Sequence, residues 1–173
     1  MSIDTLPATP LLPREELESF VAAYFDRKNQ YQSVVQKHGS PLWILESGVL
    51  KRNARQFSTA FNRFFPETSF YFAMKSNNHP EVSATLLESG FGLDVSSGVE
   101  LTSALALNAR DIIFSGPGKT DEELTLAIAH KDRVTLLLDS LGELERLKTL
   151  MSESGPTTPP VRVGIRLTTN PNG

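Results

Sequence analysis

The chain contains no cysteine. Disulfide bonds, thiolate nucleophiles and cysteine-ligated zinc sites are therefore excluded. Its three histidines, His38, His79 and His130, show no metal-ligand spacing, so no metal site is expected. No apolar run approaches the roughly 18 residues that a membrane span needs. The N-terminus has an acid before its first base and lacks an apolar stretch of the signal-peptide type, so we expect a cytoplasmic protein without membrane contact.

The chain also lacks a large excess of positive or negative charge. The chain carries 17 Lys and Arg against 20 Asp and Glu, a formal net charge of -3. A nucleic-acid partner usually requires a strongly basic surface, so none is expected. The length of 173 residues and the apolar content of 39% indicate one globular domain and exclude a disordered chain.

From residue 70 onward, short apolar runs alternate with amphipathic stretches of helical spacing. The runs are apolar on both faces, as strands of a buried parallel sheet are. They occupy residues 70–74, 91–95, 111–114, 134–138 and 161–167. Pairs with capping-box spacing, Thr120 with Glu123 and Ser140 with Glu143, predict two of the helix starts. The repeated strand–helix unit predicts an α/β fold, either an open doubly wound sheet or a (β/α)8 barrel.

The first part of the chain follows a different pattern. Residues 1–13 hold three prolines and predict an extended lead-in, and residues 14–29 predict one amphipathic helix. Residues 42–45 predict a short strand, and Ser47 is expected to cap the helix that follows.

Polar residues come at the end of each predicted strand, where both α/β architectures place their active sites. Any one of them has an ordinary explanation, because a strand becomes polar on leaving the core. Lys75 is the least ordinary, since it directly follows the run FYFAM. We expect its amine at a crowded, partly apolar mouth, where desolvation favours the neutral form that Schiff-base chemistry requires.

The segment at residues 112–124 has the strand, glycine loop and helix of a phosphate-binding P-loop, but Ile113 stands where the first glycine belongs. The Gly-x-Gly at 116–118 does not make a dinucleotide fingerprint, because Asp121 replaces the third glycine. Ser96 and Ser97 have no sign of a His or Asp partner, so a nucleophile elbow is not indicated.

Five motifs occur in order: YFAMKSNNHPEV, GFGLDVSSGVEL, IIFSGPGKTDEEL, DSLGELERL and VRVGIRLTTNP. This set closely resembles the pyridoxal-phosphate (PLP) decarboxylases of the ornithine/diaminopimelate/arginine family, over roughly residues 40–171. The resemblance implies an alanine-racemase-like (β/α)8 barrel of the TIM type, here incomplete with about five βα units. It also implies a cytoplasmic lyase of amino-acid metabolism that acts as a homodimer on a small amino acid: diaminopimelate, ornithine, arginine or a related one.

Site roles follow from the same resemblance. Lys75 matches the lysine that forms the Schiff base with PLP. Asp94 and Glu100 match acidic residues at the barrel mouth, Asp94 as a cofactor contact and Glu100 nearer the substrate. Arg166 matches an arginine beside the cofactor ring. Lys119 falls in a Gly-Lys-Thr segment that is expected to be structural.

The expected domain organisation is an N-terminal lead-in and helix over residues 1–39, followed by the N-terminal part of a PLP-binding barrel over 40–173. The family's C-terminal β domain is absent from this sequence, so the 173-residue chain is expected to be a truncated part that is inactive alone. Three alternatives stay open: a racemase-like or non-decarboxylating PLP protein, a non-catalytic degenerate homologue, and a P-loop-like nucleotide binder.

Overall fold

The computed structural model describes residues 13–153 and 159–167 and divides the chain into two compact units, Met1–Ile44 and Leu45–Gly173. The first unit holds two helices, α1 (Arg14–Phe25) and α2 (Lys28–His38). The amphipathic helix predicted over residues 14–29 is confirmed for Arg14–Phe25, but it ends there, and residues 28 and 29 belong to α2. The chain turns at Asp26 and Arg27, and the Arg27 guanidinium lies 5.0 Å from the Tyr24 ring and 6.0 Å from the Tyr31 ring. Arg27 is three residues from Tyr24 and four from Tyr31, so these contacts join close neighbours along the chain on either side of the turn.

The second unit begins with α3 (Ser47–Asn62). The strand predicted over residues 42–45 is not formed, and all four of these residues are exposed with no strand alongside them in the described part of the chain. Ser47 is the first helical residue rather than the cap, because Glu46 occupies the cap position. Phe57 and Phe61 lie on the other side of α3 from its arginines and contact Phe70, just before the first strand.

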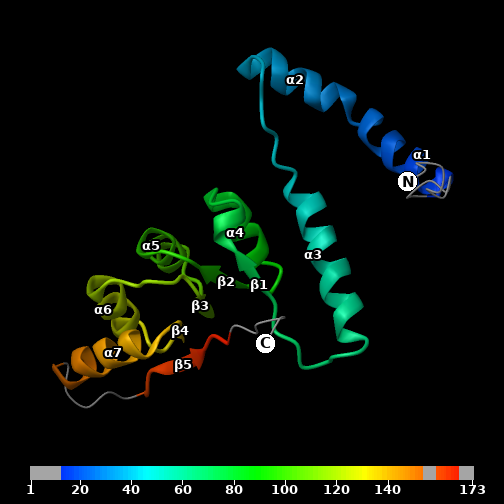
Figure 1. Cartoon of the computed structure of the whole chain (residues 1–173). Helices are drawn as coiled ribbons and strands as arrows, with labels where there is room; N and C mark the ends of the chain where they lie inside the picture. Colours follow the sequence, from blue (N-terminus) through cyan, green and yellow to red (C-terminus); the bar gives the residue numbers. More distant parts are fainter. Residues whose placement is uncertain (1–12, 154–158, 168–173) are drawn as a thin grey trace, which may run out of the picture. The chain divides into compact units, whose positions relative to one another are not determined.

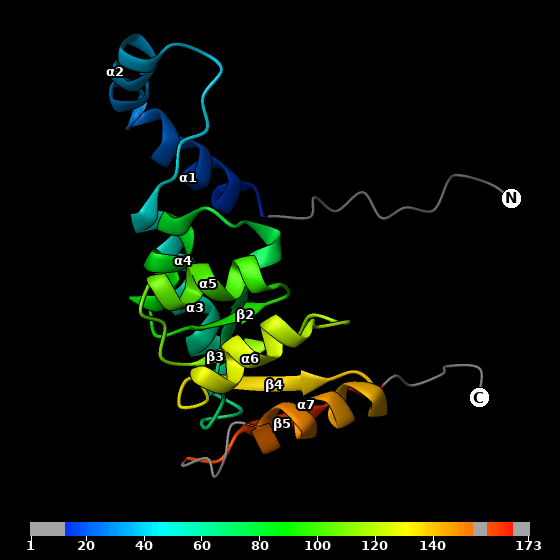
Figure 2. The same cartoon turned by 90° about the vertical axis from the view of Figure 1, so that its left-hand side faces the viewer.

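The rest of this unit alternates strands and helices. In chain order these are β1 (Tyr71–Ala73), the 3-10 helix η1 (Met74–Ser76), α4 (Pro80–Leu87), β2 (Gly92–Val95), α5 (Gly98–Ala106), β3 (Ile112–Phe114), α6 (Asp121–Ala129), β4 (Val134–Leu138), α7 (Leu141–Glu153) and β5 (Arg162–Ile165). All neighbouring strands pair in parallel in the order β1-β2-β3-β4-β5. Figures 1 and 2 show α4 to α7 following one another in chain order along the sheet. This sequential order is the one a (β/α)8 barrel requires, whereas a doubly wound sheet reverses its strand order.

Alternation along the strands separates the core from the inner face of the sheet. Side chains that point toward the helices are almost fully buried, among them Leu93, Val95, Ile112, Phe114 and Leu136. The alternate positions are half-buried, and the strand register places Ala73, Asp94, Ile113 and Thr135 beside one another on that second face. Among these four positions, Asp94 is the one that carries a charged side chain, and it lies near the carboxyl ends of the strands.

At the opposite ends of the strands, Tyr71 links β1 to the segment before β3. Its hydroxyl donates a hydrogen bond of 2.5 Å to Oδ2 of Asp111, and its ring covers Gly92, where a Cβ would overlap it. Partial burial, followed by the hydrogen bond that Tyr71 donates to Asp111, raises the pKa of Tyr71 from 10.0 to about 12.

We expect the chain to lose stability as the pH rises from about 10 to 12, because an ionised Tyr71 is disfavoured only in the folded state. The full shift corresponds to roughly 3 kcal/mol. Because the ring is partly solvated, screening reduces the expected loss to about 1 kcal/mol. Urea unfolding measured on either side of this pH range checks it, with Tyr71→Phe as the control. If the Phe variant loses as much stability as the parent chain over that range, Tyr71 is not the responsible group.

Candidate functional site

A hollow of about 340 Å³ opens at the carboxyl ends of the strands, where barrel enzymes carry their active sites. Three of the four residues singled out from the sequence line it together: Lys75, Asp94 and Arg166. The remaining lining residues are Ser96, Ser115, Gly116, Pro117 and Leu137. Residues more than 90 positions apart in the chain thus meet at one mouth.

Lys75 is placed by the short helix η1 rather than directly by a strand. Met74 takes the buried position with 1% exposure, and Ser76 Oγ donates a 2.8 Å hydrogen bond to the carbonyl oxygen of Ala73. This tight turn lifts Lys75 out of the core, and the residue is exposed. The crowded, desolvated surroundings expected for its amine are therefore not observed. Lys75 is instead accessible to a molecule that enters the hollow.

Asp94 stands on β2 in the same hollow. Its Oδ1 atom is buried and accepts no hydrogen bond from the described residues. A buried carboxylate oxygen without a donor is unfavourable by about 1–3 kcal/mol or more, so the site is suited to a ligand that brings a donor. An accessible amine beside a buried acceptor without a donor fits a ligand that carries a carbonyl group for Lys75 and a hydrogen-bond donor for Asp94.

Arg166 follows β5 and closes the hollow on its far side. Its Nη1 atom lies 3.5 Å from Oδ1 of Asp139, at the end of β4, and its backbone N–H donates to Leu138. The guanidinium is exposed, so part of its fork remains open to an anion or a carboxylate.

Glu100 is not among the residues that line the hollow. Its Oε2 accepts hydrogen bonds from the backbone N–H of Ser96 at 2.7 Å and from Ser96 Oγ at 3.0 Å. The carboxylate thus fixes the turn between β2 and α5 and points the Ser96 segment at the mouth. Glu100 was expected at the mouth itself. It lies instead behind Ser96 and acts on the hollow only by holding that residue.

The loops after β2 and β3 pack against each other through Gly116. A Cβ on Gly116 would overlap the carbonyl oxygen of Ser96, so only glycine fits there. The Glu123 side chain adds a second link, since its Oε1 accepts from Gly98 N at 2.5 Å while its Oε2 accepts from Thr120 N at 2.9 Å. The Thr120–Glu123 capping box predicted from the sequence is confirmed.

We expect Gly116→Ala to destabilise the fold by about 1–3 kcal/mol, because the backbone of one loop must move away from the other. Gly142→Ala is the matched control. Gly142 lies in α7 with no atom closer than 3.9 Å to an added Cβ, and alanine favours helix there. Chemical denaturation of the two variants should give opposite signs. Equal effects would show that the contact with Ser96 does not matter.

Lys119 is the residue that the P-loop alternative would use, and it is the most deeply buried charge of the fold's described part, with 1% exposure. Its Nζ donates to the carbonyl oxygen of Leu137 at 2.5 Å and to Glu143 Oε1 at 3.3 Å. It cannot reach a phosphate while it is enclosed in this way, so the P-loop alternative is wrong and the structural role expected for Lys119 is supported.

The same contact explains why the second predicted capping box is only half formed. Ser140 Oγ accepts from Glu143 N at 3.1 Å, as predicted. The Glu143 carboxylate does not return the bond, because Oε2 accepts from Asp139 N at 2.9 Å and Oε1 faces Lys119.

Two further residues of the site were missed by sequence reasoning. Ser115 lines the hollow directly after β3, a position that the strand pattern itself marks, and Ser96 lines it after β2. Asp139 directly follows β4; its Oδ1 lies 3.5 Å from Arg166 Nη1, and its Oδ2 is buried without a hydrogen bond in the part of the chain described here. Its pairing with Arg166 depends on the β4–β5 register, which the sequence does not display.

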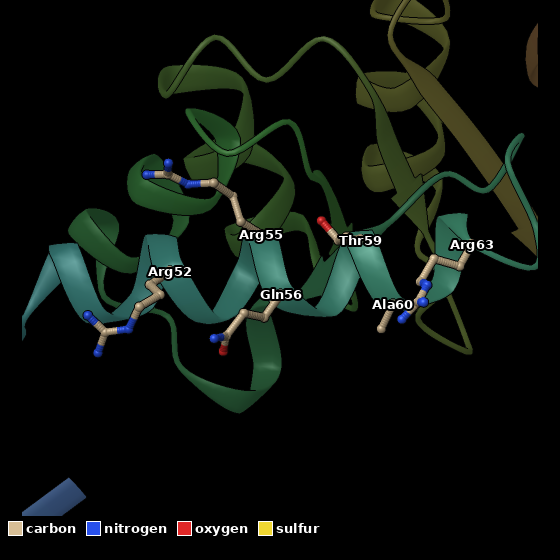
Figure 3. Close-up of a pocket in the computed structure, with 6 residues that line it drawn as sticks. All are labelled: Arg52, Arg55, Gln56, Thr59, Ala60 and Arg63. Carbon is tan, nitrogen blue, oxygen red and sulfur yellow. The ribbon is translucent and has the colours of Figure 1, made fainter. Parts of the chain in front are cut away.

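A larger hollow, of about 560 Å³, lies elsewhere (Figure 3). All six residues that line it belong to α3 or its end, and none comes from a strand end. Across residues 13–153 and 159–167, no cluster of three or more His, Asp or Glu is arranged to hold a metal. No helix within those ranges is long and apolar enough to cross a membrane.

Comparison with known proteins agrees with this geometry. Residues 47–172 match the family described as pyridoxal-dependent decarboxylase, pyridoxal binding domain. The chain is 35% identical over 147 residues to a diaminopimelate decarboxylase of Synechocystis, covering 79% of this chain and 30% of that protein. Relatives of this kind are thus about three times as long as the matched segment.

Solved structures give the same result. A diaminopimelate decarboxylase from M. jannaschii, in complex with L-lysine, superposes with a TM-score of 0.68 at 30% identity, over 77% of this chain and 31% of that one. A lysine/ornithine decarboxylase from Vibrio vulnificus, complexed with putrescine, gives 0.65 at 25% identity, over 80% and 36%. These neighbours confirm the barrel architecture, of which the five strands form a part.

Proposed function

This chain belongs to the pyridoxal-dependent decarboxylases, and from that premise we propose that it supplies the lysine-bearing part of a PLP-dependent amino-acid decarboxylase. One observation carries the proposal. The exposed amine of Lys75 and the buried, unpaired oxygen of Asp94 line the same hollow at the carboxyl edge of the sheet.

Each residue of the site has a separate proposed role. When bound, PLP supplies the electron sink that makes loss of a carboxylate from an amino acid feasible. Lys75 Nζ would hold the cofactor covalently, and Asp94 Oδ1 would accept a hydrogen bond from a protonated nitrogen of the bound group. Arg166, steadied by Asp139, would neutralise an anionic oxygen near it, because a guanidinium keeps its charge at any working pH. Glu100 would act at a distance by holding Ser96 in place.

The proposed substrate is diaminopimelate or a related amino acid with a second charged end. Proteins named diaminopimelate decarboxylase recur among the relatives, and two similar solved structures hold basic amines. A homodimer and a cytoplasmic location stay predictions.

Covalent trapping of PLP tests the role of Lys75. We expect borohydride reduction of the chain with excess PLP, followed by peptide mass mapping, to label Lys75 above every other lysine. Lys148 is a suitable internal control, because it is exposed on α7 and engaged only with Glu145. Labelling in proportion to exposure alone, with Lys75 no richer than Lys148, would contradict the proposal. A label on Lys119 would also contradict it and would reopen a phosphate-binding role for that loop.

A further inference from the structure

Lys119 is a buried charge that the proposed function does not use. Its Nζ atom donates to the carbonyl oxygen of Leu137 at 2.5 Å and lies 3.3 Å from Oε1 of Glu143. A buried ion pair adds little net stability over apolar side chains of similar volume, so stability alone does not account for a lysine at this position. A second role for its charge is suggested by what else lies within reach of Nζ.

The third group beside Nζ is the carboxylate of Asp139. Its Oδ2 atom lies 3.8 Å from Nζ, is buried, and accepts no hydrogen bond from the described residues. A buried oxygen with neither a donor nor a counter-charge is unfavourable, and the carboxylate would gain by turning Oδ2 out to water. The charge of Lys119 therefore keeps this oxygen in its inward position.

The other oxygen of Asp139 faces Arg166 at the hollow. Oδ1 lies 3.5 Å from Nη1 of Arg166, and this is the only ion pair of that guanidinium within the described residues. The backbone of Arg166 is fixed, because its N–H donates to the carbonyl oxygen of Leu138 at 2.9 Å, whereas its side chain is 55% exposed. The position of the guanidinium thus depends on where Asp139 holds its carboxylate.

The four charges alternate in sign from the core to the hollow. They come from α7, the loop after β3, the end of β4 and the end of β5, in the order Glu143, Lys119, Asp139 and Arg166. The exposed fractions of these side chains are 2%, 0%, 21% and 55% in the same order. Each charge is therefore held by a neighbour that is more deeply buried or equally enclosed, and the last one lines the hollow.

We propose that Lys119 is a positioning residue for Arg166 and that it acts through Asp139. The buried ammonium holds Oδ2 of Asp139, which turns Oδ1 toward the guanidinium and keeps Arg166 on the wall of the hollow that also holds Lys75 and Asp94. It also offsets part of the charge of Asp139, so that Arg166 keeps positive charge for a second anion. The use of that charge rests on the proposed function, whereas the restraint on Arg166 does not.

Arg166→Gln tests the series of contacts from its exposed end, where a substitution leaves the core intact. We expect it to shift the NMR signals of the Lys119 ammonium group, because Asp139 moves once its outer partner is lost. Arg162→Gln is the matched control, since Arg162 is exposed on the same strand but at the opposite end of β5. It should leave those signals in place. No shift with Arg166→Gln, or equal shifts in the two variants, would overturn the proposal.

The motion of the Arg166 side chain gives the direct measurement. Rotation about its Nε–Cζ bond, followed by NMR with labelled arginine, reports whether the guanidinium is held. Lys119→Met with Glu143→Gln removes both buried charges at similar volume. We expect the rotation to become about two- to fivefold faster in this double variant, which is the range expected for the loss of one exposed ion pair. Asp139→Asn should give the same increase.

A triple variant tests whether Asp139 is the link. If Lys119 acts through Asp139, adding Lys119→Met and Glu143→Gln to Asp139→Asn changes the rotation no further. A further increase would show another route from Lys119 to Arg166 and would overturn the proposal. Rotation at the parent rate in a double variant that is folded by circular dichroism would also overturn it. If the double variant does not fold, Arg166→Gln decides the question, because it needs no change in the core.

Neither measurement involves PLP or an amino acid, so this proposal and the proposed function can fail separately. A chain that shows the expected shifts and rotation rates but no PLP label on Lys75 would refute the proposed function and leave the restraint on Arg166 in place. A chain labelled at Lys75 in which Arg166 rotates at the same rate in every variant would refute the restraint alone.

Discussion

In a complete decarboxylase that contains this segment, replacing Lys75 with alanine or arginine is expected to reduce amino-acid decarboxylation about 10⁴-fold or more. Removal of a group that forms the covalent bond on which a reaction depends has effects of this size. Arginine keeps the positive charge but is not a nucleophile at neutral pH, so it separates the role of charge from that of the amine. Release of CO2 from diaminopimelate, with PLP added, measures the effect.

Loss of folding would not explain such a result. Lys75 is exposed at the end of a short 3-10 turn, and no ion pair within the described residues involves it. The free energy of unfolding of both variants should therefore stay within about 0.5 kcal/mol of that of the parent chain. Lys148→Ala, which removes another exposed amine, should leave CO2 release unchanged. Decarboxylation that survives in Lys75→Ala would refute the assigned role.

The largest loss of stability is expected for Lys119→Ala, at about 3–5 kcal/mol. The change removes the only cation within 4 Å of Glu143 in the described structure and leaves that carboxylate, 3% exposed, without its counter-charge. It also frees the carbonyl oxygen of Leu137 and removes a cation that lies 5.2 Å from the Phe114 ring. Domains of this size are commonly stable by only 5–15 kcal/mol, so much of the margin would disappear.

A double variant identifies the cause of that loss. Lys119→Met with Glu143→Gln removes both charges while keeping similar volumes, and it should recover a large part of the stability lost in Lys119→Ala. Lys148→Ala again provides the contrast, because its pair with Glu145 is exposed and contributes well under 1 kcal/mol. Urea unfolding of the three variants is the measurement. A double variant no more stable than Lys119→Ala would show that packing, and not the charge pair, is responsible.

The barrel could be predicted from the sequence because its signal is local and repeated. Each strand–helix unit shows its own apolar run and its own helix start, as at Pro80 and Thr120. A parallel sheet with sequential order needs nothing beyond that repetition. The break at Asp26 and Arg27 was missed because no proline or glycine stands there to mark it in the sequence.

The site was predictable to the extent that it follows strand ends. Lys75 was selected in this way, Asp94 and Arg166 came from the family resemblance, and the structure gathers all three around one hollow. Their surroundings were not predictable, because they depend on register and on turns. The exposed position of Lys75 in η1 depends on the hydrogen bond from Ser76 to Ala73, and the position of Glu100 behind Ser96 depends on the two hydrogen bonds that Ser96 donates to it. The burial of Lys119 depends on α7 presenting Glu143 to a loop 24 residues earlier.

The position of Glu143 has a consequence for motion. Its two carboxylate oxygens receive the backbone N–H groups of Asp139 at 2.9 Å and Lys119 at 3.3 Å, so one side chain of α7 ties down the end of β4 and the loop after β3. Neither amide can become accessible to solvent unless α7 moves away. Both should therefore exchange their hydrogens for deuterium at a common rate, governed by the detachment of that helix as one cooperative segment. The rim of the hollow would then fluctuate as a unit and not loop by loop.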